Sequence, residues 1–243
     1  MEAFPDHILL HAPQRRAQLI QAFYEAHHKN NRDISQAKDD RKKLAFYCQQ
    51  LEQHHIHVRQ GIDLGCRGGA LTRELVKFGP WLGVDLDRNA IALANANGIP
   101  CIEMDISTAI DIKDESVDAV CMTEVLEHLP YPSVTVYEIW RILEKKETSV
   151  FMGSVPLDYH LHRRYAVWRG KRLTSDPTHL RSFSYNELKM LLEHYFAHVE
   201  FAPMRGTKVR YPWLSWNHFV RDIAWVARGP RKDVGEWDIS LIQ

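Results

Sequence analysis

The stretch Gly61-Ile-Asp-Leu-Gly-Cys-Arg-Gly-Gly69 decides the fold of this chain. Apolar residues run into a cluster of small residues, and residues 70–76 then have the composition of a helix. A strand, a glycine-rich turn and a helix in this order let the backbone approach a nucleotide-like ligand closely, with the helix N-terminus facing it. The spacing is Asp63-x-Gly65-x-Arg67-x-Gly69, which differs from the G-x-G-x-x-G of nicotinamide-dependent dehydrogenases. We therefore disfavour that class.

Strand-like and helix-like segments alternate from residue 58 onward. This alternation predicts an α/β fold with a doubly wound parallel sheet and right-handed crossovers. Expected strands cover residues 60–64, 81–85, 100–104, 117–122, 149–152, 198–201 and 223–227, and expected helices cover 89–97, 134–143 and 187–194.

Size and composition indicate an ordinary globular domain. The 243 residues suit one α/β domain with additions, and 31 basic residues balance 31 acidic ones, so the net charge does not point to a polyanionic partner. The four cysteines form no C-x-x-C pair, which suggests buried thiols in a reducing compartment. There is no apolar export signal and no apolar run of about 18 residues, so we expect a cytoplasmic protein without a membrane span.

The first 57 residues are helical in pattern. Apolar positions recur at helical spacing in residues 19–26 and again in residues 44–51. We divide the chain into an N-terminal helical cap, residues 1–57, and a ligand-binding domain, residues 58–243. The alternative is that these helices simply pack on the sheet.

Three acidic residues follow three successive strands. Asp63, Asp85 and Asp105 should share one edge of the sheet, because the carboxyl ends of parallel strands meet where ligands bind. Asp85 lies about 20 residues after the glycine-rich loop, the position of a carboxylate that accepts hydrogen bonds from ribose hydroxyls.

With these residues placed, the chain resembles the class I methyltransferases that use S-adenosylmethionine (SAM), specifically those with small-molecule substrates. The resemblance rests on residues 62–69, 83–87, 104–106 and 118–129. It implies a seven-stranded, mostly parallel sheet with an antiparallel last strand, and SAM as cofactor. Arg67 departs from the family pattern, which has glycine there. The implied cofactor-binding residues are Asp63, Gly65, Cys66, Gly69, Asp85, Leu86, Asp105, Ile106 and Thr123.

The segment Glu124-Val-Leu-Glu-His128 carries the most informative polar cluster. On a helical turn, residues 124, 127 and 128 would share one face and could hold Mg²⁺ or Mn²⁺. In this pattern the segment resembles metal-dependent O-methyltransferases of the ubiquinone pathway and of small-RNA 3′ ends. The RNA enzymes have a further, later histidine, and His179 is similar to it. The candidate metal set is Glu124, Glu127, His128 and His179.

A reading without metal gives the two histidines a catalytic role. His128 and His179 would then face the acceptor, and a neutral imidazole with a pKa near 7 would take its proton.

Residues 156–182 form a predicted substrate-binding insertion after the fifth strand. The segment is locally basic with interleaved aromatic residues, and we select Tyr159, Arg163 and Arg164 as substrate-binding candidates. Arginine suits phosphate or carboxylate groups, which favours an anionic acceptor. RNA would use the same features. The alternative is a solvated basic loop.

These observations favour transfer of a methyl group from SAM to a hydroxyl of a small, anionic, sugar- or metabolite-like acceptor, with nitrogen as a less favoured acceptor atom. Two alternatives stay open. One is a metal-dependent RNA 2′-O-methyltransferase, and the other is an inactive protein that binds SAM for regulation.

Overall fold

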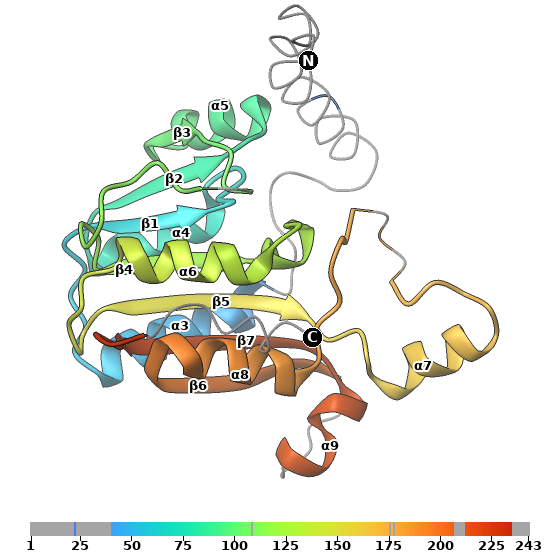
Figure 1. Cartoon of the computed structure of the whole chain (residues 1–243). Coiled ribbons are helices and arrows are strands. Elements are labelled where there is room, and N and C mark those ends of the chain that lie inside the picture. Colours follow the sequence, from blue (N-terminus) through green and yellow to red (C-terminus); the bar gives the residue numbers. More distant parts are fainter. Residues whose placement is uncertain are drawn as a thin grey trace, which may run out of the picture.

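The computed structural model describes residue 22 and residues 40–107, 109–174, 176, 178–206 and 212–234 (Figure 1). These residues form a seven-stranded sheet in the order β3-β2-β1-β4-β5-β7-β6. The expected α/β fold with its doubly wound sheet is confirmed. The strands are β1 (Gly61–Leu64), β2 (Trp81–Asp85), β3 (Cys101–Glu103), β4 (Ala119–Thr123), β5 (Val150–Pro156), β6 (Phe196–Gly206) and β7 (Val220–Pro230).

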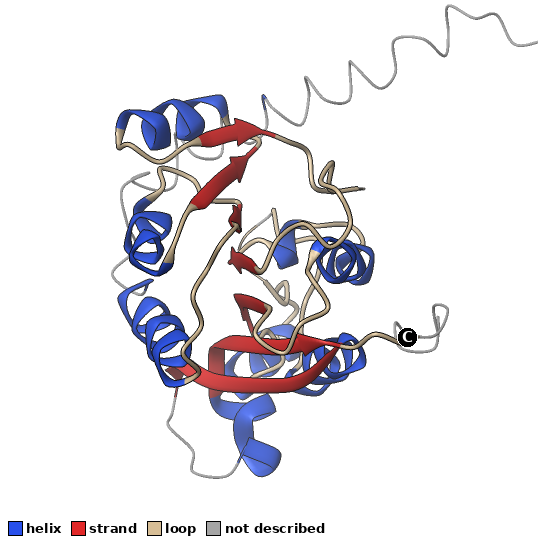
Figure 2. Ribbon diagram, turned by 90° about the vertical axis from the view of Figure 1, so that its left-hand side faces the viewer, coloured by secondary structure: helices blue, strands red, loops and turns tan. Residues whose placement is uncertain are grey.

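Helices cover both faces of the sheet (Figure 2). Buried side chains of α6 and α8 join one apolar core, and those of α3 and α4 join a second core on the opposite face. The helices are α3 (Asp40–Gln53), α4 (Ala70–Leu75), α5 (Arg88–Ala96), α6 (Pro132–Ile142), α7 (Leu161–Trp168), α8 (Tyr185–Tyr195) and α9 (Pro212–Phe219), with 3₁₀ turns η1 (Val76–Phe78) and η2 (Leu126–His128).

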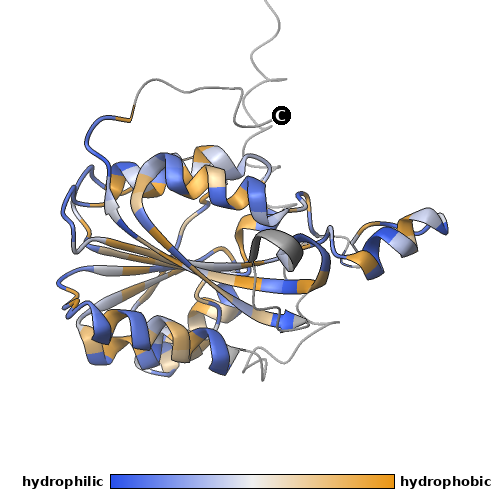
Figure 3. Ribbon diagram, turned by 90° about the horizontal axis from the view of Figure 1, so that it is seen from below, coloured by the Kyte–Doolittle hydropathy of each residue, from blue (hydrophilic) through white to orange (hydrophobic). Residues whose placement is uncertain are grey.

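Strand β5 shows why the sheet needs two covered faces. Val150 and Met152 belong to the core under α3, whereas Phe151 and Val155 belong to the core under α6 and α8. Side chains alternate between the faces of a strand, so a central strand covered on both sides is apolar throughout. Figure 3 shows the strands between two layers of helices, and hydrophilic and hydrophobic residues alternate along those helices.

The last two strands are longer than their apolar patterns indicate. β7 pairs antiparallel with both β5 and β6, which confirms the expected antiparallel last strand. The fully buried Trp225 of β7 lies over Gly153 of β5, where a Cβ would come within 2.2 Å of the indole ring. Pairing on both sides of β7 extends its regular backbone beyond the residues expected, 223–227.

Helix starts follow the local sequence. α8 begins at a capping box in which Ser184 accepts from the Glu187 N–H and Glu187 accepts from the Ser184 N–H. α5 begins after Asp87, whose side chain accepts from the Asn89 N–H. α9, Pro212–Phe219, leads directly into β7.

The described part of the N-terminal region is α3, which packs against the sheet through the fully buried Tyr47 and Leu51. The expected helix at residues 19–26 lies, apart from residue 22, outside the described residues. The division into residues 1–57 and 58–243 therefore stays a prediction. Among the described residues, we find no helix with the length and apolar character that a membrane span requires.

Candidate active site

The loop between β1 and α4 closes tightly. Gly65, Arg67 and Gly69 have φ angles of 78°, 53° and 74°, all in the left-handed region. A Cβ on Gly65 would lie 2.4 Å from Val125 Cγ2, and one on Gly69 would lie 3.0 Å from Ile99 Cγ1. Arg67 adopts a conformation that costs a residue with a side chain roughly 1 kcal/mol. The loop thus keeps its left-handed turn with arginine where the resembling family has glycine.

The carboxylate of Asp85, at the end of β2, holds this loop in place. Its Oδ2 accepts from the Arg67 N–H at 2.8 Å, and its Oδ1 accepts from the N–H groups of Leu86 and Asp87 at 2.8 and 2.9 Å. A carboxylate offers about four lone-pair positions. One position therefore remains for a ligand hydroxyl, and a second hydroxyl would have to share the contact with Arg67.

The other two strand-end carboxylates differ in exposure. Asp63 is buried, accepts from the Thr72 hydroxyl at 2.5 Å, and has its pKa raised by burial to about 7. Asp105 is exposed and accepts from the Ser107 N–H at 2.8 Å. Asp105 can therefore reach a ligand directly, whereas Asp63 ties β1 to α4 behind the loop.

The remaining predicted cofactor residues gather at the same edge, because β1, β2, β3 and β4 are parallel. Leu86 and Ile106 are half-buried, and Cys66 is buried beneath the loop. Thr123 is half-buried, with its hydroxyl 3.3 Å from that of Tyr47. A loop with no room for side chains, beside a carboxylate with acceptor capacity, fits a cofactor that contains adenosine.

The turn after β4 differs from the expected helical face. Glu124 has φ 55° and precedes the 3₁₀ turn η2, so it does not share a helical face with residues 127 and 128. Its Oε1 instead accepts from the Ser154 hydroxyl at 2.7 Å and pairs with the Lys43 ammonium at 2.8 Å. Burial would raise the pKa of Glu124, but Lys43 and Ser154 more than offset this, so the pKa is lowered. The expected face was wrong because the chain reverses at Glu124.

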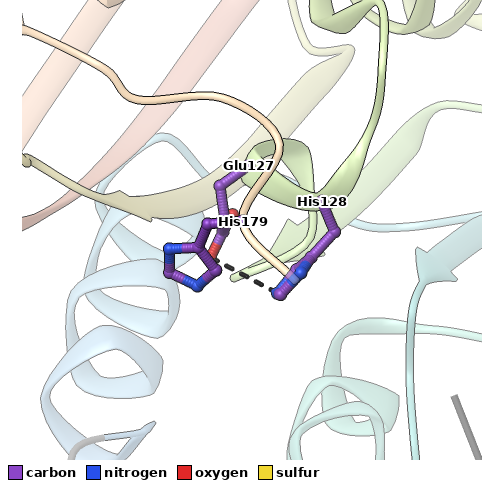
Figure 4. A group of neighbouring side chains, drawn as sticks. All are labelled: Glu127, His128 and His179. Atoms are coloured by element: carbon purple, nitrogen blue, oxygen red, sulfur yellow. Dashed lines mark ion pairs between the residues drawn. The ribbon is translucent and has the colours of Figure 1, made fainter. Parts of the chain in front are cut away.

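Three of the four candidate metal ligands nevertheless come together. Donor atoms of Glu127, His128 and His179 all lie within 4.8 Å of one another (Figure 4). The backbone carbonyl of Glu127 accepts from the N–H groups of Leu180 and Arg181 at 2.9 and 3.0 Å, which fastens the loop carrying His179 to η2. The Glu127 side chain is 1% exposed, and its Oε2 has no hydrogen-bond partner among the described residues. Burial and the nearby Glu124 charge raise the pKa of Glu127.

His128 is held in one tautomer. Its Nδ1 lies 3.1 Å from the Thr178 carbonyl oxygen, which can only accept, so Nδ1 carries the proton and Nε2 keeps its lone pair. Burial, together with the neighbouring His179, lowers the pKa of His128 to about 4. The expected value near 7 is not found because desolvation penalises the charged ring. At neutral pH the side chain is an uncharged acceptor.

His179 packs edge-on against His128, with ring centroids 4.8 Å apart. Its Nδ1 lies 3.3 Å from the Thr174 hydroxyl, and its Nε2 lies 3.8 Å from Asp176 Oδ2. Burial lowers the pKa of His179, although Asp176 and Asp158 oppose the shift. Both rings of the pair are therefore uncharged at neutral pH.

The predicted substrate residues separate into two groups. Arg163 lies close enough to the site for its charge to act on the pKa of both Asp158 and His179. Arg164 instead donates from Nε to the Tyr159 carbonyl at 2.6 Å and so supports the chain that enters α7. Figure 1 shows α7 projecting from the body of the domain. Arg163 therefore acts electrostatically on Asp158 and His179, whereas Arg164 is engaged with the backbone before α7.

Sequence reasoning did not select Lys43, Ser154 or Asp158. Lys43 ends the charged run Asp39-Asp-Arg-Lys-Lys43, which is typical of a solvated surface, and nothing in it signals a buried ammonium. Asp158 is 1% exposed, its Oδ2 has no hydrogen-bond partner among the described residues, and burial raises its pKa. It follows β5 by two residues. The strand-end rule that selected Asp63, Asp85 and Asp105 would have found it.

Comparison with known proteins identifies a related domain. Residues 62–151 match a family model described as a methyltransferase domain. The chain is 31% identical over 90 residues to a ubiquinone biosynthesis O-methyltransferase of Nitrosococcus oceani, which covers 34% of this chain and 38% of the relative. The mitochondrial ubiquinone biosynthesis O-methyltransferase of Saccharomyces cerevisiae is 24% identical over 178 residues, 67% of this chain and 56% of the relative. The matches thus span about half or less of each relative's length.

Solved structures show the same fold. A putative methyltransferase from Bacillus halodurans superposes with a TM-score of 0.58 at 16% identity, covering 77% of this chain and 99% of that one. A SAM-dependent methyltransferase from Archaeoglobus fulgidus superposes with a TM-score of 0.55 at 18% identity, covering 76% and 94%. Together with the sheet order, these matches confirm the fold that the sequence motifs predict.

The low pKa of His128 predicts how stability depends on pH. Above pH 6.5 the ring is neutral in both states and contributes nothing. As the pH falls from 6.5 toward 4, the unfolded chain binds a proton that the folded chain does not, so the free energy of unfolding falls. Urea denaturation at pH 7 and pH 5 measures how much the free energy of unfolding falls between them. This fall should be roughly 1–2 kcal/mol smaller for His128→Gln than for the unsubstituted chain.

The matched control is His57→Gln, which removes an exposed histidine between α3 and β1 and should leave the pH-dependent loss of stability unchanged. Equal losses for His128→Gln and the unsubstituted chain would contradict the assignment of a buried neutral imidazole.

Proposed function

We propose that this chain, which has the fold and the core domain of the class I SAM-dependent methyltransferases, transfers the methyl group of SAM to a hydroxyl oxygen of a small anionic acceptor. The observation that carries the proposal is the placement of His128. Its neutral imidazole, with a lone pair on Nε2, lies on the turn after β4, and Val125 of that turn packs against Gly65 of the cofactor loop. A proton acceptor therefore adjoins the predicted cofactor site.

The cofactor half of the site comes from the loop and the ends of β2 and β3. Asp85 would accept from the ribose hydroxyls, Asp105 would contact the adenine, and Gly65 and Gly69 would admit the methionine part close to the backbone. When bound, SAM supplies an electrophilic methyl group on a positively charged sulfur, so the protein's task is to orient the acceptor and remove its proton.

The acceptor half is built around the histidine pair. The Thr178 carbonyl fixes the His128 ring through Nδ1, which leaves Nε2 to take the hydroxyl proton as the new bond to oxygen forms. His179 packs against the same ring and helps to exclude water. The buried surroundings keep both rings neutral at physiological pH. Because the lowered pKa makes His128 a weak base, the proton moves to Nε2 only as the hydroxyl oxygen becomes positively charged by the arriving methyl group.

An oxygen acceptor is favoured over nitrogen by the relatives, which are named as O-methyltransferases. An anionic acceptor is favoured by Arg163. Its positive charge acts on both Asp158 and His179, so an anionic group bound near them would be stabilised by this guanidinium. We propose a phosphate or carboxylate on the acceptor as the partner of Arg163.

As the alternative to proton acceptance at His128 Nε2, we propose that Glu127, His128 and His179 hold a divalent cation, because one lone pair cannot bind both the ion and the proton. The donor set fits, because two imidazoles and a carboxylate lie within 4.8 Å of one another and the Glu127 Oε2 is buried without a partner among the described residues. His128 also shows the usual arrangement of a ligating histidine, with its second nitrogen bonded to a backbone carbonyl. The imidazole ligands favour Mn²⁺ over Mg²⁺. The cation would supply positive charge that lowers the pKa of a nearby hydroxyl.

Replacement of Asp85 tests the cofactor site. Asp85→Ala should weaken SAM binding by about tenfold or more, because the ribose hydroxyls lose their acceptor and the loop loses its contact at Arg67. Isothermal titration with SAM measures the change. Glu103→Ala is the matched control, since Glu103 pairs with Arg88 on an exposed part of β3 and should leave SAM affinity unchanged. Unchanged affinity in a folded Asp85→Ala chain would reject the cofactor assignment.

Two neighbouring arginines test the acceptor. Tritiated SAM and the chain are incubated with small-molecule extract fractions separated on an anion exchanger, and label is expected in a retained fraction. With that fraction as substrate, Arg163→Gln should raise KM severalfold with a smaller change in kcat, because the anion loses its partner. Arg164→Gln should have the smaller effect, since Arg164 contacts the Tyr159 carbonyl. Label confined to unretained fractions would rule out an anionic acceptor.

Mn²⁺ titration tests the cation site without relying on activity. Calorimetry should detect one Mn²⁺ site that Glu127→Gln and His179→Gln both remove. Glu124→Gln is the matched control and should retain the site, because Glu124 is already paired with Lys43 and Ser154. If the unsubstituted chain binds no Mn²⁺, or if Glu124→Gln abolishes binding, the proposed three-residue set is wrong and His128 acts as a proton acceptor alone.

A further inference from the structure

Two cysteines meet beneath the cofactor loop, and nothing in the proposed reaction uses them. The sulfurs of Cys66, in the loop, and Cys101, at the start of β3, lie 3.2 Å apart. Both thiols are free, and the exposed fraction is 6% for Cys66 and 8% for Cys101. The other two cysteines, Cys48 and Cys121, are also buried, and among the described contacts neither has a sulfur neighbour.

Gly83 of β2 makes this meeting possible. A Cβ at Gly83 would lie 2.6 Å from the Cys66 sulfur and 3.2 Å from the Cys101 sulfur. Any side chain on the strand between the two cysteines would therefore push the sulfurs apart. Gly83 is also the register partner of Cys101 in the β2–β3 pair. The two sulfurs thus approach each other across β2 in a space that only glycine leaves open.

The location also gives small oxidants a route to the pair. β3 is the edge strand of the sheet, has three residues and pairs only with β2 in the sheet order. Short edge strands open more readily than central ones. The contact between the sulfurs lowers the pKa of the Cys101 thiol, because the Cys66 S–H stabilises the Cys101 thiolate, and raises the pKa of Cys66. Cys101 is therefore the more nucleophilic of the two.

We propose that Cys66 and Cys101 form a dithiol modification site that a hydroperoxide oxidises to a disulfide. The Cys101 thiolate attacks one peroxide oxygen, the O–O bond breaks, and the products are a sulfenic acid at Cys101 and one hydroxide, or alkoxide, ion. The Cys66 sulfur then attacks the Cys101 sulfur, the S–O bond breaks, and water leaves with the Cys66 proton. The peroxide is reduced by two electrons and the two thiols supply them.

The cross-link would act on the cofactor loop. Bond formation requires the sulfurs to close from 3.2 Å to about 2.05 Å, which draws Cys66 toward β3. The adjacent residue, Arg67, gives its N–H to Asp85, so this movement disturbs the contact that positions the ribose acceptor. The oxidised chain is thus expected to bind SAM more weakly. This consequence rests on the proposed function, whereas formation of the cross-link does not.

Peptide mapping tests the cross-link directly. The reduced chain is treated with hydrogen peroxide, remaining thiols are blocked, and the product is digested with trypsin without reductant. Cleavage after Arg59, Arg67, Arg88 and Lys113 should yield residues 60–67 joined to residues 89–113, a product that dithiothreitol separates. Cys66→Ser and Cys101→Ser should each abolish it, and Cys48→Ser should leave it unchanged. Peroxide treatment that oxidises other sites without joining these peptides would overturn the proposal.

SAM affinity tests the consequence. Calorimetry on the oxidised chain should give a severalfold larger dissociation constant for SAM, and dithiothreitol should restore the original value. The SAM affinity of Cys101→Ser should not respond to peroxide. A cross-linked chain with unaltered SAM affinity would overturn the effect on the loop. A chain that forms the cross-link but binds no SAM even when reduced would reject the proposed function and leave the modification site standing.

Discussion

The Asp85 carboxylate is the contact on which the cofactor half of this domain depends. It accepts three backbone N–H groups, from both the glycine-rich loop and the end of its own strand, and so joins two connections that the sheet alone does not hold together. Hydrogen bonds from N–H groups to a carboxylate are among the stronger ones in proteins. They also offset the free-energy cost of the left-handed backbone conformation at Arg67. One side chain thereby shapes the loop and presents an acceptor toward the ligand.

Beyond the loop, the charges at the carboxyl edge are arranged so that neighbouring acidic groups do not all carry charge. Glu124 stays ionised because the ammonium of Lys43 arrives from α3, whereas Glu127, Asp158 and Asp63 have raised pKa values because they are buried. A buried carboxylate without a cation favours its neutral form. Helix α3 therefore contributes more than packing, since its Lys43 supplies the ammonium that pairs with Glu124 at this edge.

Much of the fold could be predicted because its signals are local. Apolar alternation and the capping box at Ser184 depend on residues a few positions apart, and Asp63, Asp85 and Asp105 each follow from the end of the strand beside them. The acceptor site could be predicted only in part. Its histidines were found from a motif, but the reversal at Glu124 and the burial of Lys43 arise from contacts between segments far apart in the chain. The pKa of His128 likewise depends on packing that no pattern of residues reports.

In the sequence, His128 precedes β5 and His179 follows it. The predicted cofactor contacts lie within residues 61–123, while the loop carrying His179 is fastened to η2 by its bonds to the Glu127 carbonyl. The segment between β5 and α8 can therefore change in length or charge without altering the predicted contacts to the methyl donor. On the proposed function, one module would serve the common reagent and an exchangeable one the acceptor, so that one scaffold could acquire new targets.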